Sequence, residues 1–354
     1  MKIVIAGGGT AGHIEPALNV ADELLTRHPN AQIVALGTQR GLETTLVPAR
    51  GYPLHLIPAV PLPRAINRDL FSLPWRLKRA IAECKEVLSD ADVLIGFGGY
   101  VALPAYLAAR GRVPIVVHEA NAKAGLANRV GARFACAVAE TVAGSMKQAI
   151  LTGIPLRESI QSFDRDATRA IAREYFKIPP GVTVLLVFGG SQGAAKINSV
   201  MNQAQKAGLF EGLQVIHAVG SKNDVPQNLP TSYHAFHYLD QMNLAYAAAD
   251  FVISRSGAMT VAELTAVGLP ACFVPFPIGN GEQKLNAEAV VSAGGALLIE
   301  DEKFTTDYLA DVVLPLVNDE SRRAEMAKIS AGFGHRDASA RIADIVERVI
   351  AGDR

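Results

Sequence analysis

The chain repeats one pattern: a short apolar run, a turn of small residues, then a helical spacing of apolar positions. Lys2–Ala6 is the first such run, and the glycine-rich turn after it leads into a predicted helix from about Pro16 to Thr26. Further apolar runs begin at Ile33, Val93, Val184 and Ala249. Apolar runs that alternate with helical patterns are typical of buried parallel strands. The pattern therefore predicts an α/β protein whose parallel sheets are covered by helices on both faces.

The glycine turns occur on both sides of the midpoint of the chain. Ligands of parallel sheets bind outside the carboxyl ends of the strands, so we expect two Rossmann-like domains that face one cleft. The pattern is interrupted around 153–166, which predicts a first domain over 1–158 and a second over 159–334. An apolar stripe within 335–354 predicts an amphipathic helix that could pack back on the first domain. The stripe consists of Ile342, Ile345, Val346, Val349 and Ile350.

Composition narrows the class of protein. With 354 residues, 49% of them apolar and 19% charged, the chain is typical of a folded two-domain protein. Its 34 basic and 34 acidic residues cancel, which disfavours a nucleic-acid partner. The three cysteines are scattered and contain no CxxC pair, as expected in a reducing compartment. No signal peptide and no apolar run of about 20 residues is evident. We expect a cytoplasmic protein that could touch a membrane.

The stretch from Ile253 to Asn286 has the strongest binding signature. Ser256-Gly257 turns an apolar strand into a helix that Gly268 ends. The N-terminus of such a helix presents unpaired N–H groups and the positive end of the helix dipole, which suit a phosphate. Glu263 lies one turn further along, where its carboxylate can accept both hydroxyls of a ribose. The stretch therefore predicts a site for a nucleoside diphosphate.

Two other motifs are weaker. Gly7, Gly9 and Gly12 match the G-x-G-x-x-G dinucleotide fingerprint, but no acidic residue follows the second strand. We therefore expect a tight turn that another polar ligand approaches, rather than a site for NAD or FAD. Asp164-Arg165-Asp166 spells DxD, yet it precedes a helical run, so we interpret it as acids at a helix N-terminus.

The segment 61–82 combines apolar and basic side chains. Its members include Leu70, Phe71, Leu73, Trp75, Arg76, Lys78 and Arg79. This mixture suits an anionic membrane surface. The alternative is an ordinary helix with an apolar side on the core and a solvated basic face, and the residues alone leave both possibilities open.

Five motifs in order carry a resemblance to a known family. They are Gly8–Pro16, Gly96–Val101, His118–Ala122, Gly189–Ala194 and Arg255–Glu263. Together they resemble the MurG family of UDP-N-acetylglucosamine transferases of peptidoglycan synthesis, over nearly the whole chain. The resemblance implies a glycosyltransferase B fold. It also implies an inverting transfer of N-acetylglucosamine from UDP-N-acetylglucosamine to the 4-hydroxyl of N-acetylmuramoyl in lipid I, which gives lipid II.

The resemblance also implies a location and partners. These are the cytoplasmic face of the cell membrane, its anionic inner surface, and other cell-wall synthesis proteins. No cofactor is expected to be tightly bound. A divalent cation such as Mg²⁺ is expected to stimulate the reaction without a dedicated protein site, because no ligand cluster is evident in the sequence.

Residue roles implied by the resemblance fall into three groups. The donor's diphosphate would lie on Ser191 and on the turn formed by Ser256, Gly257, Ala258, Met259 and Thr260. Glu263 would bind the ribose, Leu239 would lie near uracil, Arg157 near the nucleotide, and Gln283, Asn286 and Asn121 on the sugar. Thr10, Ala11, Gly12 and His13 would lie between donor and acceptor, with Gly9, Gly98, Gly99 and Tyr100 on the acceptor's phosphate.

The general base is the least determined role. His13 is the first choice, since an imidazole with a pKa near about 6.5 suits proton transfer at neutral pH. The alternative for His13 is a hydrogen bond to acceptor phosphate or a cap on its helix. Glu119 is the rival base, whereas His118 is expected to be a buried packing residue. Two other functions stay open: a 2-epimerase acting on UDP-N-acetylglucosamine, and a non-catalytic nucleotide-sugar-binding scaffold at the membrane.

Overall fold

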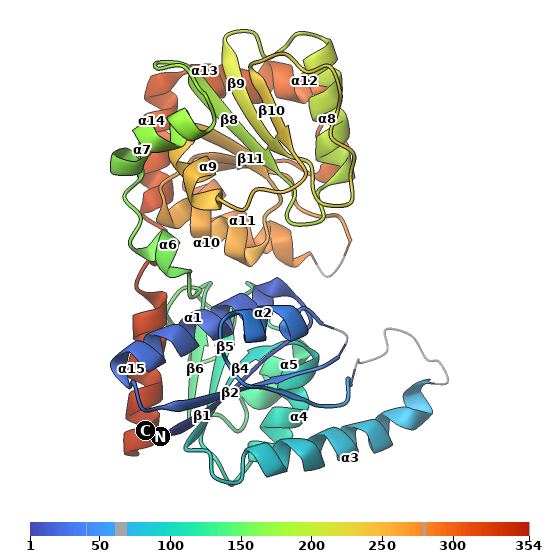
Figure 1. Cartoon of the computed structure of the whole chain (residues 1–354), viewed down its shortest axis with the longest axis vertical. Helices are drawn as coiled ribbons and strands as arrows, with labels where there is room; N and C mark the ends of the chain where they lie inside the picture. The colour runs from blue at the N-terminus through green and yellow to red at the C-terminus, as the bar shows by residue number, and fades with distance from the viewer. Residues whose placement is uncertain (40, 61–68, 279–280, 354) are drawn as a thin grey trace. The chain divides into compact units, whose positions relative to one another are not determined.

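A computed structural model describes residues 1–39, 41–60, 69–278 and 281–353 of the chain, with only the backbone of 69–72, and these residues form two α/β units. The first unit consists of residues 1–157 and 336–354, and the second of residues 158–335 (Figure 1). These boundaries lie within one residue of the positions 158 and 335 inferred from the sequence pattern.

The first unit is built on a seven-stranded parallel sheet in the order β3-β2-β1-β4-β5-β6-β7. The strands are β1 (Lys2–Gly7), β2 (Gln32–Gly37), β3 (Leu54–Leu56), β4 (Val93–Gly98), β5 (Ile115–Glu119), β6 (Ala137–Glu140) and β7 (Ile150–Leu151). The helices are α1 (Ala11–Arg27), α2 (Glu43–Ala49), α3 (Asp69–Val87), α4 (Gly99–Ala109), α5 (Leu126–Gly131) and α15 (Ala338–Ala351).

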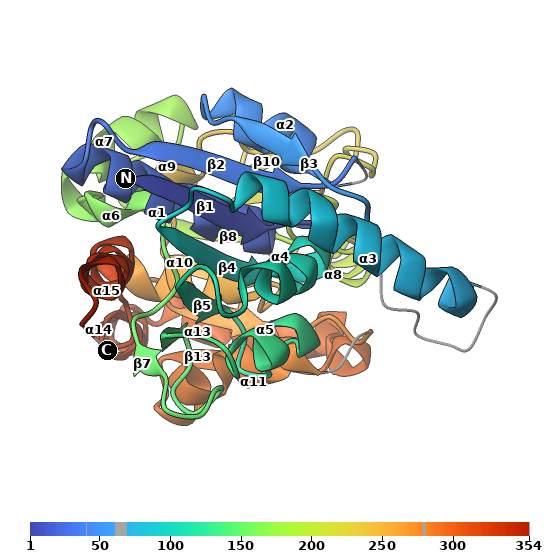
Figure 2. The same cartoon turned by 90° about the horizontal axis from the view of Figure 1, so that it is seen from below.

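Alternation along the strands creates two cores, one on each face of this sheet. Ile3 and Ile5 of β1 pack with α1, α2 and α15, whereas Val4 and Ala6 pack with α3 and α4. Side chains of a strand point alternately to opposite faces, so an unbroken apolar run buries both. In Figure 2, α3, α4 and α5 follow one another along one face. On that face α3 is the segment 69–87, α4 follows β4 directly, and a loop of residues 120–125 joins β5 to α5.

Helix α15 returns from the second unit to pack in the first. Its residues Ile342, Ile345, Val346 and Val349 are buried in the core that α1 shares, with Ile350 packed against it. Arg27 on α1 bonds Asp344 and Glu347 on α15, with Nη1–O distances of 2.6 and 3.2 Å. The C-terminal helix is therefore a structural part of the first unit.

Helix α1 begins five residues earlier than expected, at Ala11 rather than near Pro16. The N–H groups of His13 and Ile14 already donate to Thr10 O, at 3.1 and 3.2 Å. Pro16 falls in the second turn, where its missing N–H removes one hydrogen bond of the helix without ending it. The glycine turn is thus the start of α1 itself, which fixes His13 on a helix rather than on a loop.

The second unit has a six-stranded parallel sheet in the order β10-β9-β8-β11-β12-β13. Its strands are β8 (Thr183–Phe188), β9 (Leu213–Ala218), β10 (Tyr233–Phe236), β11 (Phe251–Ser254), β12 (Ala271–Phe273) and β13 (Ala296–Leu298). Its α-helices are α6 (Glu158–Gln161), α7 (Arg165–Tyr175), α8 (Ala195–Lys206), α9 (Met242–Ala248), α10 (Ala258–Ala266), α11 (Glu282–Ser292), α12 (Thr306–Tyr308), α13 (Leu314–Asn318) and α14 (Glu320–Ala331). A 3₁₀ turn, Asp301–Lys303, and a π turn, Leu309–Val313, complete it.

The DxD sequence caps a helix, as expected. Asp164 is the N-cap of α7, and its side chain accepts from Ala167 N at 3.0 Å. The same helix carries Arg169 and Arg173, which both form ion pairs with Asp250. Asp250 also accepts from Val184 N at 2.8 Å. The motif therefore starts a helix that is fixed to the sheet through one carboxylate.

Candidate active site

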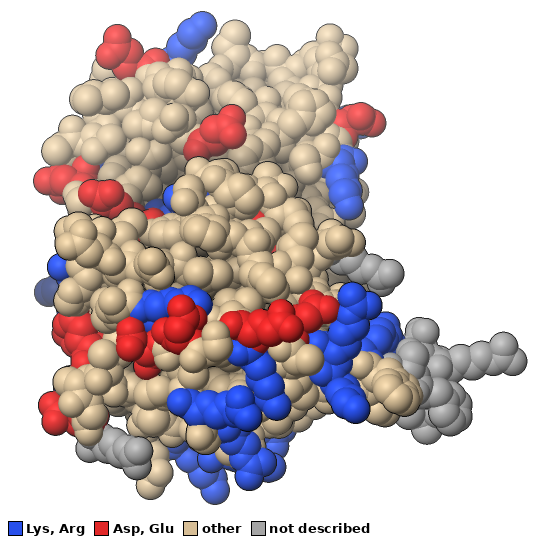
Figure 3. Space-filling model, turned by 60° about the horizontal axis from the view of Figure 1, so that its bottom comes forward, with Lys and Arg blue, Asp and Glu red and all other residues tan. Residues whose placement is uncertain are grey.

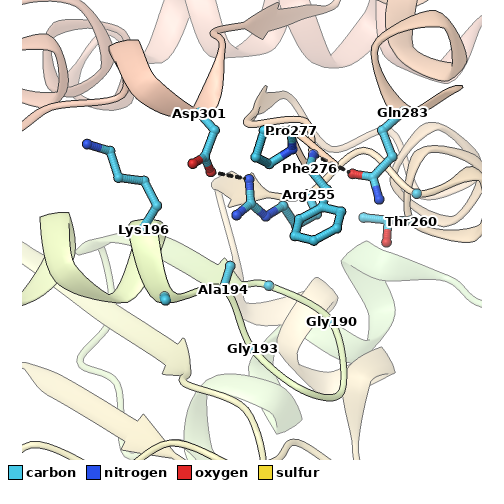
Figure 4. A pocket seen from close by; sticks show the side chains of 13 residues that line it. Gly190, Gly193, Ala194, Lys196, Arg255, Thr260, Phe276, Pro277, Gln283 and Asp301 are labelled. Carbon is cyan, nitrogen blue, oxygen red and sulfur yellow. Dashed lines mark hydrogen bonds and ion pairs between the residues drawn. The ribbon is translucent and has the colours of Figure 1, made fainter. Parts of the chain in front are cut away.

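A cavity of about 510 Å³ in the second unit is bordered by the N-termini of two helices. The loop 189–194 leads into α8, and Gly257 precedes α10; both contribute to the lining (Figure 4). The first N–H groups of a helix have no partner within the helix, and the dipole is positive at that end. Two such ends around one cavity favour a ligand with two linked anionic groups, such as a diphosphate. Thr260 adds a hydroxyl in the first turn of α10.

Arg255 holds one wall of this cavity together. Its Nη1 donates to Val274 O at 2.9 Å and to Pro275 O at 3.1 Å, and it forms an ion pair with Asp301. The guanidinium also lies 5.5 Å from the ring centre of Phe276. Figure 4 shows Arg255, Asp301 and Phe276 grouped, whereas the Lys196 side chain extends from α8 away from them. Asp301 neutralises Arg255, and Lys196 therefore adds a positive charge to the lining.

Two predicted sugar-binding residues of this unit are held by specific hydrogen bonds. Gln283 lines the cavity, and its Oε1 accepts from Phe276 N at 2.9 Å. This bond uses the amide oxygen of Gln283, so the NH₂ group is on the side of the amide opposite Phe276 N (Figure 4). Glu263 accepts from the hydroxyl of Tyr246 at 2.7 Å, and Tyr246 is fully buried. The carboxylate predicted for the ribose therefore has a fixed support.

Other predicted donor residues are not among those that line the cavity. Ser256 is fully buried, and its hydroxyl has no hydrogen-bond partner among the described residues. Asn286 is buried, with Nδ2 3.5 Å from Ser256 O. Ser191 is exposed in the glycine loop, and Leu239 is buried after β10. Ala258 and Met259 belong to the first turn of α10.

A buried network positions the glycine loop from behind. The hydroxyl of Tyr233 lies 2.8 Å from His217 Nδ1, and His217 Nε2 lies 3.1 Å from Asn198 Oδ1. Asn198 donates in turn to Val219 O. The backbone of Gly193 packs closely against the same oxygen, because a Cβ added at Gly193 would lie only 1.9 Å from it. Burial lowers the pKa of His217 to about 4, so this imidazole is neutral at physiological pH. The sequence pattern gave no sign of this support, because its members are far apart in the chain.

Two glycine turns of the first unit pack against each other. A Cβ added at Gly99 would lie 2.1 Å from Gly8 O, and the φ angle of Gly99 is +80°. Gly9 donates through its N–H to the buried carboxylate of Glu43 at 3.1 Å. Glu43 also accepts from Thr38 N at 2.8 Å. Glu43, which no local sequence pattern marks, therefore fixes the first turn.

The His13 ring lies between these turns. Its Nδ1 is 3.1 Å from Thr10 Oγ1, and Thr10 is the N-cap of α1. A Cβ added at Gly98 would lie 3.1 Å from His13 Cδ2 and 3.3 Å from Asn128 Nδ2. Predicted residues 9–13 and 98–100 are therefore brought together, with the side chain of Tyr100 49% exposed beside them.

Glu119, the alternative base, is buried at the end of β5 and surrounded by donors. Its Oε1 accepts from Asn121 N at 2.9 Å, and its Oε2 from Gly125 N at 3.0 Å and Asn128 Nδ2 at 2.9 Å. Tyr106, also buried, donates to Asn128 Oδ1 at 2.8 Å. This arrangement makes Glu119 the organising group of the 119–128 segment, which includes Asn121.

His118 and Arg157 make contacts with residues other than His13. His118 is fully buried, its Nε2 lies 3.0 Å from Gly153 O, and burial lowers its pKa to about 4. The expectation of a packing residue is confirmed. Arg157, predicted near the nucleotide, is half-exposed, with Nε 3.8 Å from Glu15 Oε2.

The segment proposed to touch a membrane is partly helix α3. Trp75 is 75% exposed, with Lys78 Nζ 5.7 Å from its ring centre, and Arg79 is exposed beside it. Leu73 instead packs against the core, because it lies on the inner face of this amphipathic helix, and Arg76 is only partly exposed. The side chains of Leu70 and Phe71, and residues 61–68, lie outside the described residues.

The described residues were compared with what a metal site and a membrane-spanning helix require. Within the described ranges, no group of three or more His, Cys, Asp or Glu residues could hold a metal ion. None of the helices described is both long and apolar enough to span a membrane. Of the loop before Gln283, residues 279–280 lie outside the described residues.

The comparisons with known proteins cover both units. Residues 3–140 match the glycosyltransferase family 28 N-terminal domain, and residues 184–342 match the corresponding C-terminal domain. A relative from Mycobacterium sp. (strain KMS) is 54% identical over 365 residues, covering 100% of this chain and 98% of its own. It is named UDP-N-acetylglucosamine–N-acetylmuramyl-(pentapeptide) pyrophosphoryl-undecaprenol N-acetylglucosamine transferase.

Solved structures of similar fold match the chain over nearly its whole length. The crystal structure of Acinetobacter baumannii MurG superposes with a TM-score of 0.77 at 27% identity, covering 98% of this chain and 99% of that one. A UDP-N-acetylglucosamine 2-epimerase superposes at 0.66 with 14% identity, covering 100% and 97%, which shows the fold alone. The predicted two-domain glycosyltransferase B fold is confirmed. The chain belongs to glycosyltransferase family 28, and within it to the family of the UDP-N-acetylglucosamine transferases named above.

Proposed function

We propose that the chain transfers N-acetylglucosamine from UDP-N-acetylglucosamine to the 4-hydroxyl of N-acetylmuramoyl in lipid I, which gives lipid II. The observation that carries the proposal is the match to transferases of that name along the whole chain. The cavity between the N-termini of α8 and α10 supports it, since it suits the donor's diphosphate. The 2-epimerase structure is only 14% identical to this chain and supports the shared fold alone.

The second unit would bind and stabilise the leaving group. When the bond between the sugar's anomeric carbon and the β-phosphate oxygen breaks, UDP leaves with an additional negative charge. N–H groups at a helix N-terminus are already oriented toward that charge and need no reorganisation. Lys196 would add a cation on the same side, while Gln283 and Glu263 would hold the sugar and the ribose.

His13 would take the proton as the acceptor's 4-oxygen bonds to the anomeric carbon with inversion. With the proton of the neutral ring on Nδ1, facing Thr10, the lone pair is on Nε2, the side of the ring next to Gly98. Glu119 would act through position rather than proton transfer, because both of its oxygens already accept hydrogen bonds.

The test is to incubate the protein with labelled UDP-N-acetylglucosamine and a short-chain lipid I analogue, and to measure UDP release and label in the lipid. Label in the lipid with equal UDP release is expected; UDP release without labelled lipid would indicate a hydrolase or epimerase. His13→Ala should lower kcat by about 10²-fold or more if it removes the base. His28→Ala, at the other end of α1, is the control. A normal kcat with a raised acceptor KM would show that His13 only binds.

Membrane contact through α3 is the second part of the proposal, at the cytoplasmic face of the cell membrane. Exposed Trp75 beside Lys78 and Arg79 suits an interface with anionic lipid (Figure 3 shows Lys and Arg gathered over this part of the first unit). Trp75→Ala should reduce sedimentation with anionic vesicles, whereas Tyr175→Ala, an exposed aromatic of the second unit, should not. Equal sedimentation of both variants and the wild type would contradict it.

We also propose that a divalent cation stimulates turnover by binding the diphosphate rather than a site of its own. Chelator titration should then lower the rate but leave UDP-sugar binding. Loss of binding itself would refute this part.

A further inference from the structure

A second cavity, of about 650 Å³, lies in the first unit and has no role in the proposal above. It is bordered by three segments: the loop after β5, helix α5 with the turn that follows it, and the loop after β6. The lining residues are Ala122, Lys123, Ala124, Arg129, Ala132, Arg133, Ser145, Met146, Lys147 and Gln148. Four of them are cationic and none is acidic, in a chain whose net charge is zero. The cavity therefore favours an anionic ligand.

Its walls are fixed by two buried carboxylates at the ends of neighbouring strands. Glu119 of β5 and Glu140 of β6 are partners in the sheet register. Glu119 accepts from Asn121 N and Gly125 N, which hold one loop. Glu140 accepts from Gly144 N at 2.8 Å and Met146 N at 2.9 Å, which hold the other. The cavity is thus preformed at the carboxyl ends of parallel strands, where such sheets bind ligands.

Helix α5 connects this cavity to the group that we propose as the reaction centre. Helix α5 carries Asn128, which lies near the His13 ring across Gly98, and next to it Arg129, which lines the cavity. Arg133 stands four residues later, just past the end of α5, and lines the same cavity. A ligand that reacts beside His13 could therefore extend a branch into the cavity.

The chemistry of the proposed acceptor identifies that branch. In a muramyl sugar the peptide is attached through the oxygen at carbon 3, next to the reacting 4-hydroxyl, whereas the pyrophosphate is on carbon 1, across the ring. A pentapeptide ends in a carboxylate. The cavity volume lies within the range of about 300–1,000 Å³ for whole small-molecule ligands and exceeds the need of one phosphate. Ala122, Ala132 and Met146 offer apolar contacts beside the cations.

We propose that this cavity is a subsite for the peptide branch of the acceptor, in which Arg129 and Arg133 bind its carboxylates. The inference rests on the proposed function. It makes the first unit selective for acceptors with an anionic peptide, independently of donor binding in the second unit.

The test compares binding of two soluble acceptor analogues, one with the free peptide carboxylates and one with carboxamides. Calorimetry with the wild type should show about five- to tenfold weaker binding of the carboxamide, since each exposed ion pair contributes modestly. Arg129→Gln/Arg133→Gln should bind both analogues equally, at the weaker value. Lys85→Gln/Arg112→Gln, which removes two exposed charges of the same unit outside the cavity, is the matched control and should keep the wild-type difference.

Three outcomes would overturn the proposal. These are equal binding of both analogues by the wild type, an undiminished preference in the double variant, or the same loss of preference in the control. A double variant that loses only binding to anionic vesicles would identify a phospholipid headgroup as the occupant instead. Because binding needs no turnover, failure of the transferase assay with both analogues would count against the proposed function and leave this result standing.

Discussion

Glu119→Gln separates a positioning role of this carboxylate from a role as the base. Glu119 is buried and accepts from Asn121 N, Gly125 N and Asn128 Nδ2 at 2.9 to 3.0 Å. Glutamine keeps the shape but replaces one oxygen with an NH₂ group. That group would face at least one buried N–H donor, and the charge that strengthens the remaining bonds is lost.

The magnitude follows from these contacts. A buried donor left without a partner costs about 1–3 kcal/mol, and hydrogen bonds to a charged group contribute about 1.5–3 kcal/mol. We therefore expect Glu119→Gln to lower the free energy of unfolding of the first unit by about 3 kcal/mol. For a unit of this size that lowers the midpoint of thermal unfolding by about 6–12 °C. Turnover should fall as well, because the loop with Asn121 loosens.

The assay is thermal unfolding followed by circular dichroism, beside kcat for each variant. Glu83→Gln makes the same chemical change at a surface ion pair with Arg79 and should cost no more than about 1 kcal/mol. A Glu119→Gln protein as stable as the wild type, with kcat lowered about 10²-fold or more, would refute the positioning role and make Glu119 the base.

Three further predictions concern the fold. Gly99→Ala should destabilise the first unit by about 2 kcal/mol or more and abolish turnover, since its Cβ would lie 2.1 Å from Gly8 O at a φ angle of +80°; an unchanged melting midpoint would contradict this. Asp250→Asn should cost about 3 kcal/mol in urea unfolding of the second unit, because Arg169 and Arg173 both lose their partly buried charged partner; a loss below about 1 kcal/mol would show that the pair is solvated. The stability of the second unit should fall as the pH drops from about 6.5 to about 4, since the unfolded state protonates His217 before the folded state does, by up to about 3 kcal/mol at pH 4; His217→Gln should reduce that slope for the second unit, and an unchanged slope would show that His217 does not contribute to it.

The repeated pattern of apolar runs and glycine turns was enough to predict the architecture. Each strand of a covered parallel sheet is apolar on both faces, so Val93–Gly98 and Thr183–Phe188 are visible as runs without knowledge of their neighbours. The glycine turns are local as well, since a positive φ angle such as that of Gly9 restricts the residue type at one position. His13 and the 256–260 turn could be proposed as site residues for the same reason.

The supports of the site depended on the tertiary structure. Asp301 reaches Arg255 across 46 positions, His217 reaches Asn198 across 19, and Glu43 reaches Gly9 across 34. No local pattern marks such pairs, because each forms only when the sheet brings the ends of separate strands together. The burial of Glu119 is of the same kind, and so is the inward orientation of Leu73. The sequence by itself determined which segments carry the chemistry, because those signals are local. Only the folded chain decided which polar side chains act on a ligand and which hold the others in place, because hydrogen bonding and burial depend on neighbours that are distant in sequence.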